Sequence, residues 1–248
     1  MKFKLEICVD SVQSAMDAQK AGASRVELCD NLIEGGTTPG YGTIASARNN
    51  LDIGLHVLIR PRAGDFLYSD IEFDIMRRDL KICKECGADG IVIGILKQDG
   101  TIDVKRTAEL VELARPMSIT FHRAFDMCIN PFQGLEDIIA SGADRVLTSG
   151  QKNGAEEGSV LIRDLVVQAA NRIIIMPGSG INESNIERIA KITGAEEFHL
   201  SARKAIESLM TFRKGGITMG NAPGYNEFIR KVTDPEKIKT IIGILREL

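Results

Sequence analysis

Residues 20–29 read KAGASRVELC, and three later segments repeat their plan: ECGADGIVIG at 85–94, ASGADRVLTS at 140–149 and ITGAEEFHLS at 192–201. In each copy a Gly-Ala pair ends a helical pattern and a strand-like apolar run follows, expected at 25–29, 91–95, 145–148 and 197–200. A second series of strand-like runs lies between the copies, at 4–9, 55–59, 118–121 and 173–176. The two series interleave, so the sequence predicts eight strands that alternate with helices.

Repeated strand-helix units favour a parallel sheet, because right-handed crossovers return each strand in the same direction. The chain has 248 residues, which matches the roughly 250 residues typical of a one-domain eight-stranded barrel. We therefore predict an α/β fold, a single-domain (β/α)8 TIM barrel that spans residues 1–248. The alternative is a doubly wound open sheet.

The segment 202–233 interrupts this alternation. It contains Gly215-Gly216 and Pro223-Gly224 but no convincing strand pattern. We interpret it as a long loop after the eighth strand, since long loops of this kind in barrels commonly cover or build the active face. The alternative is an insertion on the surface.

The composition excludes several classes of protein. A formal net charge of −3 provides no basic surface for a polyanion, so we expect no nucleic-acid partner. Glu6 interrupts the first apolar run, which argues against an export signal, and no uncharged run reaches the length of a membrane helix. The five cysteines are an odd number in a well-cored chain, which favours free thiols. These observations predict a cytoplasmic protein with no membrane partner.

Alternation along the strands assigns each side chain to one of two faces of the barrel wall. Where the apolar parity packs against the helices, the other parity faces the lumen. All three histidines fall on lumen positions, together with acidic, thiol, hydroxyl and basic side chains: Glu6, Cys8, Glu27, Cys29, His56, Arg60, Thr120, His122, Glu197, His199 and Ser201. An unpaired buried charge is costly, so these groups must pair with one another or bind a ligand.

Two interpretations of the lumen cluster remain open. One is a satisfied polar core in which Arg60 bridges Glu6 or Glu27. The other is a functional site, because barrel sites lie at the carboxyl ends of the strands. The lumen residues expected at those ends are Cys8, Cys29, Arg60, His122 and His199.

Six motifs connect the chain to a known family: EIC at 6–8, RVELC at 25–29, GGTTP at 35–39, IRPRAGDF at 59–66, TFHRAFD at 120–126 and LTSG at 147–150. On these motifs the chain resembles the CutC family, named for copper homeostasis, along nearly its whole length. The resemblance implies a cytoplasmic barrel protein that handles copper. It also implies a homo-oligomer, for which a dimer is favoured.

The first functional hypothesis is that Cys8 and Cys29 bind Cu(I). Cuprous ion is soft and prefers thiolates, and inward side chains on neighbouring strands are close enough to share one ion. The alternative is that both thiols are small buried core residues, which are common without any metal. Copper is the only cofactor the sequence suggests, and no nucleotide cofactor is indicated.

The second hypothesis is an isomerase, lyase or hydrolase that acts on a small phosphorylated or carboxylated metabolite. Proton transfer would fall to Glu6, Glu27 and His122. The residues expected to bind the anion are Arg60, Arg62, Arg123, His199 and the turn Gly178, Ser179 and Gly180. Salt bridges within the protein are an equally open interpretation of the arginines. A non-catalytic interaction protein would require an exposed apolar patch.

Overall fold

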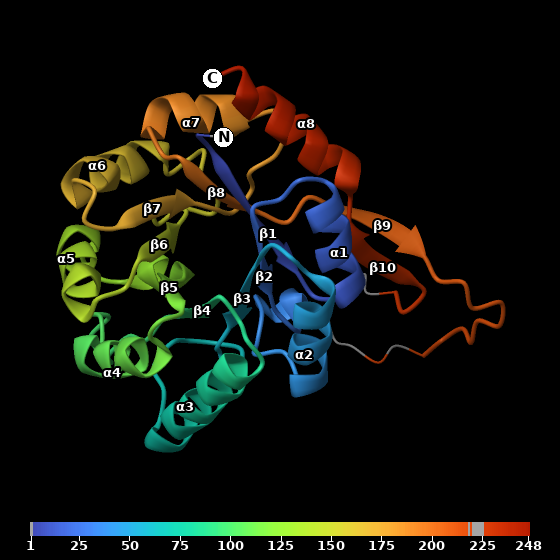
Figure 1. The fold of residues 1–248 in the computed structure, drawn as a ribbon, viewed down its shortest axis with the longest axis horizontal. Coiled ribbons are helices and arrows are strands. Elements are labelled where there is room, and N and C mark those ends of the chain that lie inside the picture. Colours follow the sequence, from blue (N-terminus) through green and yellow to red (C-terminus); the bar gives the residue numbers. More distant parts are fainter. Residues whose placement is uncertain (1, 218, 220–225) are drawn as a thin grey trace.

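Strands and helices alternate from β1 to β8, as the repeat predicts (Figure 1). The computed structural model describes residues 2–217, 219 and 226–248. The barrel elements are β1 (Lys4–Val9), α1 (Val12–Lys20), β2 (Arg25–Leu28), α2 (Tyr41–Asn50), β3 (Gly54–Leu58), α3 (Asp70–Glu85), β4 (Gly90–Ile93), α4 (Val104–Ala114), β5 (Ser118–Phe121), α5 (Pro131–Ser141), β6 (Arg145–Thr148), α6 (Ser159–Ala169), β7 (Ile174–Pro177), α7 (Ile186–Thr193), β8 (Glu197–Leu200) and α8 (Pro235–Arg246). Two short 3-10 helices follow β2 and β5, η1 (Leu32–Glu34) and η2 (Arg123–Met127).

The strands form one parallel sheet in the order β7-β6-β5-β4-β3-β2-β1-β8. This order follows the chain from β1 to β7 and returns to β8 beside β1, so the sheet curls into a barrel with the helices outside (Figure 1). Strands β7 and β8 contact each other, although the described residues contain no hydrogen-bonded ladder between them. The predicted TIM-barrel fold is confirmed.

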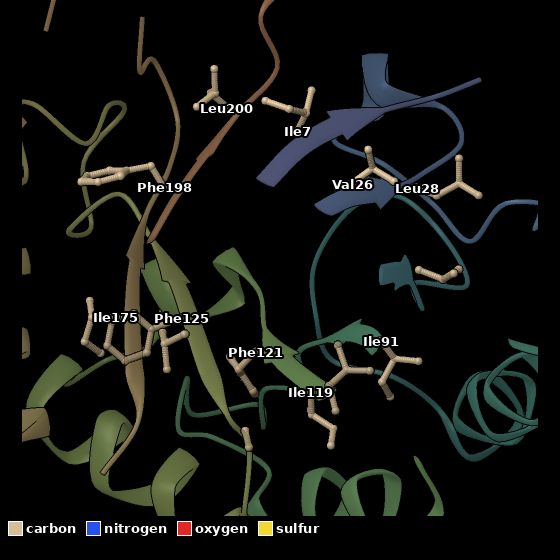
Figure 2. Close-up of a cluster of buried hydrophobic side chains, with 14 of the residues drawn as sticks. Ile7, Val26, Leu28, Ile91, Ile119, Phe121, Phe125, Ile175, Phe198 and Leu200 are labelled. Carbon is tan, nitrogen blue, oxygen red and sulfur yellow. The ribbon is translucent and has the colours of Figure 1, made fainter. Parts of the chain in front are cut away.

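The apolar parity of the strands packs outward against the helices. Figure 2 shows this core, in which Ile7, Val26, Ile119 and Phe198 belong to different strands and are fully buried. Burying such side chains provides most of the favourable free energy of folding. Because this parity points outward, the intervening residues are directed into the lumen, as the sequence predicts.

Helix starts follow the capping signals in the sequence. Ser69 accepts the backbone N–H of Glu72, and the Glu72 carboxylate accepts the N–H of Ser69, which completes a capping box at α3. Asp234 caps α8 ahead of Pro235. No helix in the described ranges combines the length and the apolar composition needed to cross a membrane.

The segment 202–233 differs from the predicted loop. Its two ends pair as antiparallel strands, β9 (Arg203–Glu207) and β10 (Ile229–Thr233), and this hairpin extends outward beside α1 (Figure 1). Residues 218 and 220–225 of the predicted loop lie outside the described residues. The prediction of a strand-free segment is wrong at both ends, because β9 reads RKAIE and lacks the apolar alternation that marks a buried strand.

Candidate functional site

A layer of ion pairs lies in the lumen toward the amino ends of the strands, where Arg25, Arg145 and Glu197 begin β2, β6 and β8. Arg25 donates from Nε to Glu6 at 2.5 Å, and its Nη2 lies 2.7 Å from Glu197. Arg145 donates to the same Glu197 carboxylate at 2.7 Å. All four side chains are buried. The expected polar core therefore exists, with alternating charges that satisfy one another.

The arginines that pair with the lumen glutamates are Arg25 and Arg145, whereas the sequence suggested Arg60. The guanidinium of Arg60 donates to the carbonyls of Glu34, Gly36 and Gly64 at 2.6 to 2.9 Å, so the predicted bridge from Arg60 to Glu6 or Glu27 is wrong. Strand alternation contained the missing signal: Arg25 has the same parity as Glu27 on β2.

Two thiols meet near the carboxyl ends of β1 and β2. Cys8 lies opposite Glu27 in the parallel pairing, and Cys29 follows Glu27 by two residues on the same face. The Sγ atoms of Cys8 and Cys29 are 3.9 Å apart, both side chains are buried and neither forms a disulfide. With a carboxylate oxygen of Glu27 they form a group whose donor atoms all lie within 4.8 Å of one another. The predicted pair of metal-ligating cysteines is thus brought together.

His199 on β8 connects the thiol pair to the ion-pair layer. Its Nδ1 donates to Oε1 of Glu6 at 2.8 Å, and its Nε2 lies 3.7 Å from Oε2 of Glu27. Burial disfavours a charged imidazole, but the nearby Glu27, Cys8 and Glu6 outweigh it and raise the pKa of His199 well above its usual value. Burial also opposes ionisation of Glu6, yet Arg25 and His199 hold its pKa well below the usual range.

The two thiols differ in protonation. A hydrogen bond from Cys29 lowers the pKa of Cys8 despite burial, with further help from His199 and the Arg203 charge. The same hydrogen bond, together with burial, raises the pKa of Cys29. The hydrogen bond between them thus favours a thiolate on Cys8 over a thiolate on Cys29. Burial and the Cys8 thiolate raise the pKa of Glu27 well above its usual value.

The other two histidines are also buried, but they stay neutral. Burial lowers the pKa of His56 to about 4, and its Nδ1 lies 3.5 Å from Glu6. Burial also lowers the pKa of His122 to about 3, where the charge of Arg60 adds to the effect. The ring of His122 packs 5.0 Å from that of Phe66 and its Nδ1 accepts the N–H of Ala124. His122 thus contacts neither Glu6 nor the thiols.

The residues predicted to bind an anion are engaged in contacts within the chain. Arg62 donates from Nε to Glu72 at 2.5 Å and from Nη2 to Asp65 at 2.9 Å. Arg123 donates to Asp126 at 2.7 Å and to Ser149 at 2.9 Å. With Arg60 held by carbonyls, each guanidinium braces loops at the carboxyl ends of the strands.

The glycine-rich turn after β7 is shaped by its neighbours. A Cβ at Gly178 would lie 2.5 Å from a methyl group of Leu147 and 3.3 Å from Cβ of His199, so a larger residue would have to displace the Leu147 side chain beside the candidate site. Ser179 donates from Oγ to the carbonyl of Asn153 at 2.7 Å, and the carbonyl of Gly180 accepts side-chain amides of the loop that precedes α7. The turn therefore supports the wall next to His199, and its role in anion binding stays a prediction.

Comparisons with known proteins agree with the motifs. A model of the CutC family matches residues 3–204. The chain is 51% identical over 237 residues to a CutC family protein of Chromobacterium violaceum, and the match covers 96% of each chain. It is 47% identical over 246 residues to the copper homeostasis protein cutC homolog of Mus musculus, covering 99% of this chain and 90% of the mouse protein. The solved structure of a copper homeostasis protein CutC of Streptococcus agalactiae superposes with a TM-score of 0.77 at 36% identity, covering 80% of this chain and 98% of that one.

Proposed function

Because this chain belongs to the CutC family, we propose that it acts in copper homeostasis by binding Cu(I) as cargo between the thiolates of Cys8 and Cys29. The observation that supports this most strongly is the buried Sγ pair, 3.9 Å apart and not oxidised to a disulfide. Two thiolates are the donor set that a soft monovalent ion prefers.

The sulfur separation fits one shared ion. Metal–thiolate bonds are about 2.3 Å long, so an ion can reach two sulfurs separated by up to about 4.6 Å. The observed separation between Cys8 and Cys29 is shorter, at 3.9 Å, so the ion would bridge them in a bent arrangement without movement of the strands. Glu27 supplies the third donor atom of the group.

Charge balance favours a monovalent ion. The pKa of Cys8 is lowered and that of His199 is raised, which favours a thiolate beside an imidazolium, whereas the raised pKa of Cys29 favours a protonated thiol. Exchange of that proton for Cu(I) leaves the total charge of the buried site unchanged. A divalent ion would add one uncompensated positive charge, which is expensive away from water.

Glu6 and His199 have supporting roles in this proposal. The carboxylate of Glu6 fixes the orientation of the imidazole through Nδ1 and, with Glu27 and Cys8, raises its pKa. The imidazolium then offsets the negative charge of a bis-thiolate Cu(I) centre. Hydrogen-bonded groups behind a metal site commonly tune its affinity in this way.

The proposed site also requires a reducing compartment. Cys8 and Cys29 must stay unoxidised to bind Cu(I), and free thiols persist in the cytosol. We therefore place the activity in the cytoplasm, in agreement with the sequence-based expectation.

The test is an anaerobic Cu(I) titration against a chromophoric chelator. We expect one tight site per chain in the native protein and its loss in a Cys8→Ser, Cys29→Ser double variant. Cys86→Ser is the matched control, because Cys86 lies at the end of α3, away from the barrel lumen. Equal Cu(I) affinity in the native protein and the double variant would overturn the proposal.

A further inference from the structure

A second group of buried polar side chains lies at the carboxyl ends of β3, β4 and β5. Arg60 follows β3 by two residues, His122 directly follows β5, and Tyr68 belongs to the loop between β3 and α3. All three are at most 6% exposed. Because β4 lies between β3 and β5 in the sheet, the ends of these strands are neighbours at the face where barrel sites lie (Figure 1). These three side chains, with Phe66, are called the Arg60 site.

Each of the three polar side chains has one buried atom without a hydrogen-bond partner among the described residues. These atoms are Nε of Arg60, Oη of Tyr68 and Nε2 of His122. The described part of the chain contains six such side-chain atoms, and half of them belong to this one site. An unpaired polar atom away from water costs free energy, so three of them together indicate a place that a ligand completes.

The three unpaired atoms are all hydrogen-bond donors. Nδ1 of His122 accepts the N–H of Ala124 at 3.1 Å, and burial keeps the imidazole neutral by lowering its pKa to about 3, so Nε2 carries the proton. Burial raises the pKa of Tyr68 to about 12 against the nearby charges of Arg60 and Arg62, so the hydroxyl keeps its proton at neutral pH. Nε of a guanidinium can only donate. A ligand that satisfies all three atoms must therefore supply acceptors.

The site also holds a positive charge. The Nη atoms of Arg60 donate to three backbone carbonyls, none of which carries a net charge. No carboxylate among the described residues forms an ion pair with this guanidinium. A buried cation is costly without an opposite charge, so the acceptor that fits the site best is an anion.

Phe66 forms the outer wall of the site. Its ring centroid lies 5.2 Å from Cζ of Arg60 and 5.0 Å from the ring centroid of His122, so one aromatic ring packs against both polar groups. Phe66 is partly exposed and lies in the irregular loop between β3 and α3. On the inner side, a Cβ at Gly94 would overlap Cε1 and Nδ1 of His122, so glycine allows the imidazole to lie against the end of β4. Rotation of the Phe66 side chain would therefore open the site while the donors keep their positions.

We propose that the Arg60 site binds a small oxyanion, the carboxylate or phosphate group of a small molecule, when the Phe66 ring moves aside. Nε of Arg60, Oη of Tyr68 and Nε2 of His122 donate to its oxygens, and the charge of Arg60 balances that of the anion. Hydrogen bonds to an ionised acceptor are stronger than those between neutral groups. The site is distinct from the proposed copper site, because it includes neither thiol and neither Glu6 nor Glu27.

The first test measures binding to the full-length protein of two minimal probes, inorganic phosphate and acetate. Thermal unfolding is followed at constant ionic strength, which sodium chloride maintains. We expect at least one probe to raise the unfolding midpoint in a saturable way, and calorimetric titration to give one site per chain. The probe that binds more tightly identifies the group as a phosphate or a carboxylate. No stabilisation by either probe at about 50 mM, far above a millimolar dissociation constant, would overturn the proposal.

Tyr68→Phe separates binding from folding. The substitution removes an unpaired donor and no hydrogen bond within the described chain. Without an anion, the variant should be at least as stable as the native protein, yet its dissociation constant for the anion should rise about tenfold to hundredfold. Tyr41→Phe is the matched control, because Tyr41 is exposed on α2, and it should change neither quantity. Unchanged anion affinity in Tyr68→Phe, or a loss of stability without the anion, would contradict the proposed donor.

His122→Asn tests the imidazole in the same way. Asparagine keeps an acceptor for the N–H of Ala124 but lacks the Nε2 donor, so anion binding should weaken by a similar factor. Equal affinity in His122→Asn and the native protein would contradict a site of three donors. Cu(I) titration of Tyr68→Phe and His122→Asn should match the native protein, so the outcome at the Arg60 site is independent of the proposed metal site.

Discussion

Replacement of Glu6 by Gln tests whether charge balance holds the barrel interior together. The Glu6 carboxylate is fully buried and accepts from Arg25 at 2.5 Å and from His199 at 2.8 Å. Glutamine preserves the shape but removes the negative charge. The variant thus leaves two buried cations with one fewer counter-charge.

The expected cost follows from these contacts. Removing one partner of a buried ion pair typically costs about 3–5 kcal/mol. Arg25 retains Glu197 at 2.7 Å, and His199 can lose its proton, so we expect the lower end of that range, about 3 kcal/mol. The pKa of Glu6 is lowered in the folded protein, so its charge contributes fully above the unfolded value of 4.5. This contribution is lost as the pH falls below 4.5 through the folded pKa, and the difference between variant and native protein should shrink there.

Equilibrium unfolding in urea at pH 7 and at several lower pH values measures this difference. Glu196→Gln is the control, because Glu196 directly precedes β8 and its carboxylate is exposed. The control should change the free energy of unfolding by less than about 0.5 kcal/mol. A loss below about 1 kcal/mol in Glu6→Gln at pH 7 would refute the reasoning, since such a value is typical of an exposed pair.

Three further results are expected. Glu6→Gln should also weaken Cu(I) binding about tenfold or more in chelator competition, because His199 loses the carboxylate that orients it and helps to raise its pKa; an unchanged affinity would show that the imidazole of His199 does not support the copper site. Because the pKa of Cys29 is raised, Cu(I) binding should displace one proton from its thiol. The Cu(I) dissociation constant should therefore fall about tenfold for each unit that the pH rises between about pH 6 and 8. A dissociation constant that does not change with pH would contradict proton release from Cys29. Gly94→Ala should destabilise the barrel by about 1–3 kcal/mol in thermal unfolding, because the new methyl group would overlap the His122 ring, whereas Gly243→Ala in α8 meets no atom within 4 Å and should be neutral or stabilising.

The sequence was sufficient for the fold because two periodicities repeat along it. The Gly-Ala joints mark where each helix ends, and the apolar parity then assigns an inward face to each strand. That reasoning placed Cys8, Cys29, Glu27 and His199 in the lumen, where the structure has them. The predicted strand limits differ by one or two residues, as at β3, which spans Gly54–Leu58.

The contacts of the site depend on register, which no single strand encodes. The pairing of Cys8 with Glu27 sets the sulfur separation, and only the assembled sheet determines it. One of the two open interpretations paired Arg60 with Glu6 or Glu27 because all three have inward parity, yet the Arg60 side chain donates to loop carbonyls at the strand ends. Unpaired carbonyls in loops are not visible as a sequence pattern, so this contact could not be predicted.

The hairpin of β9 and β10 was missed for a different reason. Its strands pair with each other outside the barrel, and four of the five residues of β9 are exposed. Such a strand lacks the apolar alternation on which the prediction relied. The roles of Arg62, Arg123 and Ser179 in anion binding stay predictions.

X-ray absorption at the copper edge, on native protein loaded anaerobically with one equivalent of Cu(I), tests the central claim most directly. We predict two sulfur neighbours at about 2.3 Å from each copper. Cys8→Ser should lower that number to one, because Cys29 remains. A spectrum with only nitrogen and oxygen neighbours in the native protein would contradict a copper site built on these two thiols.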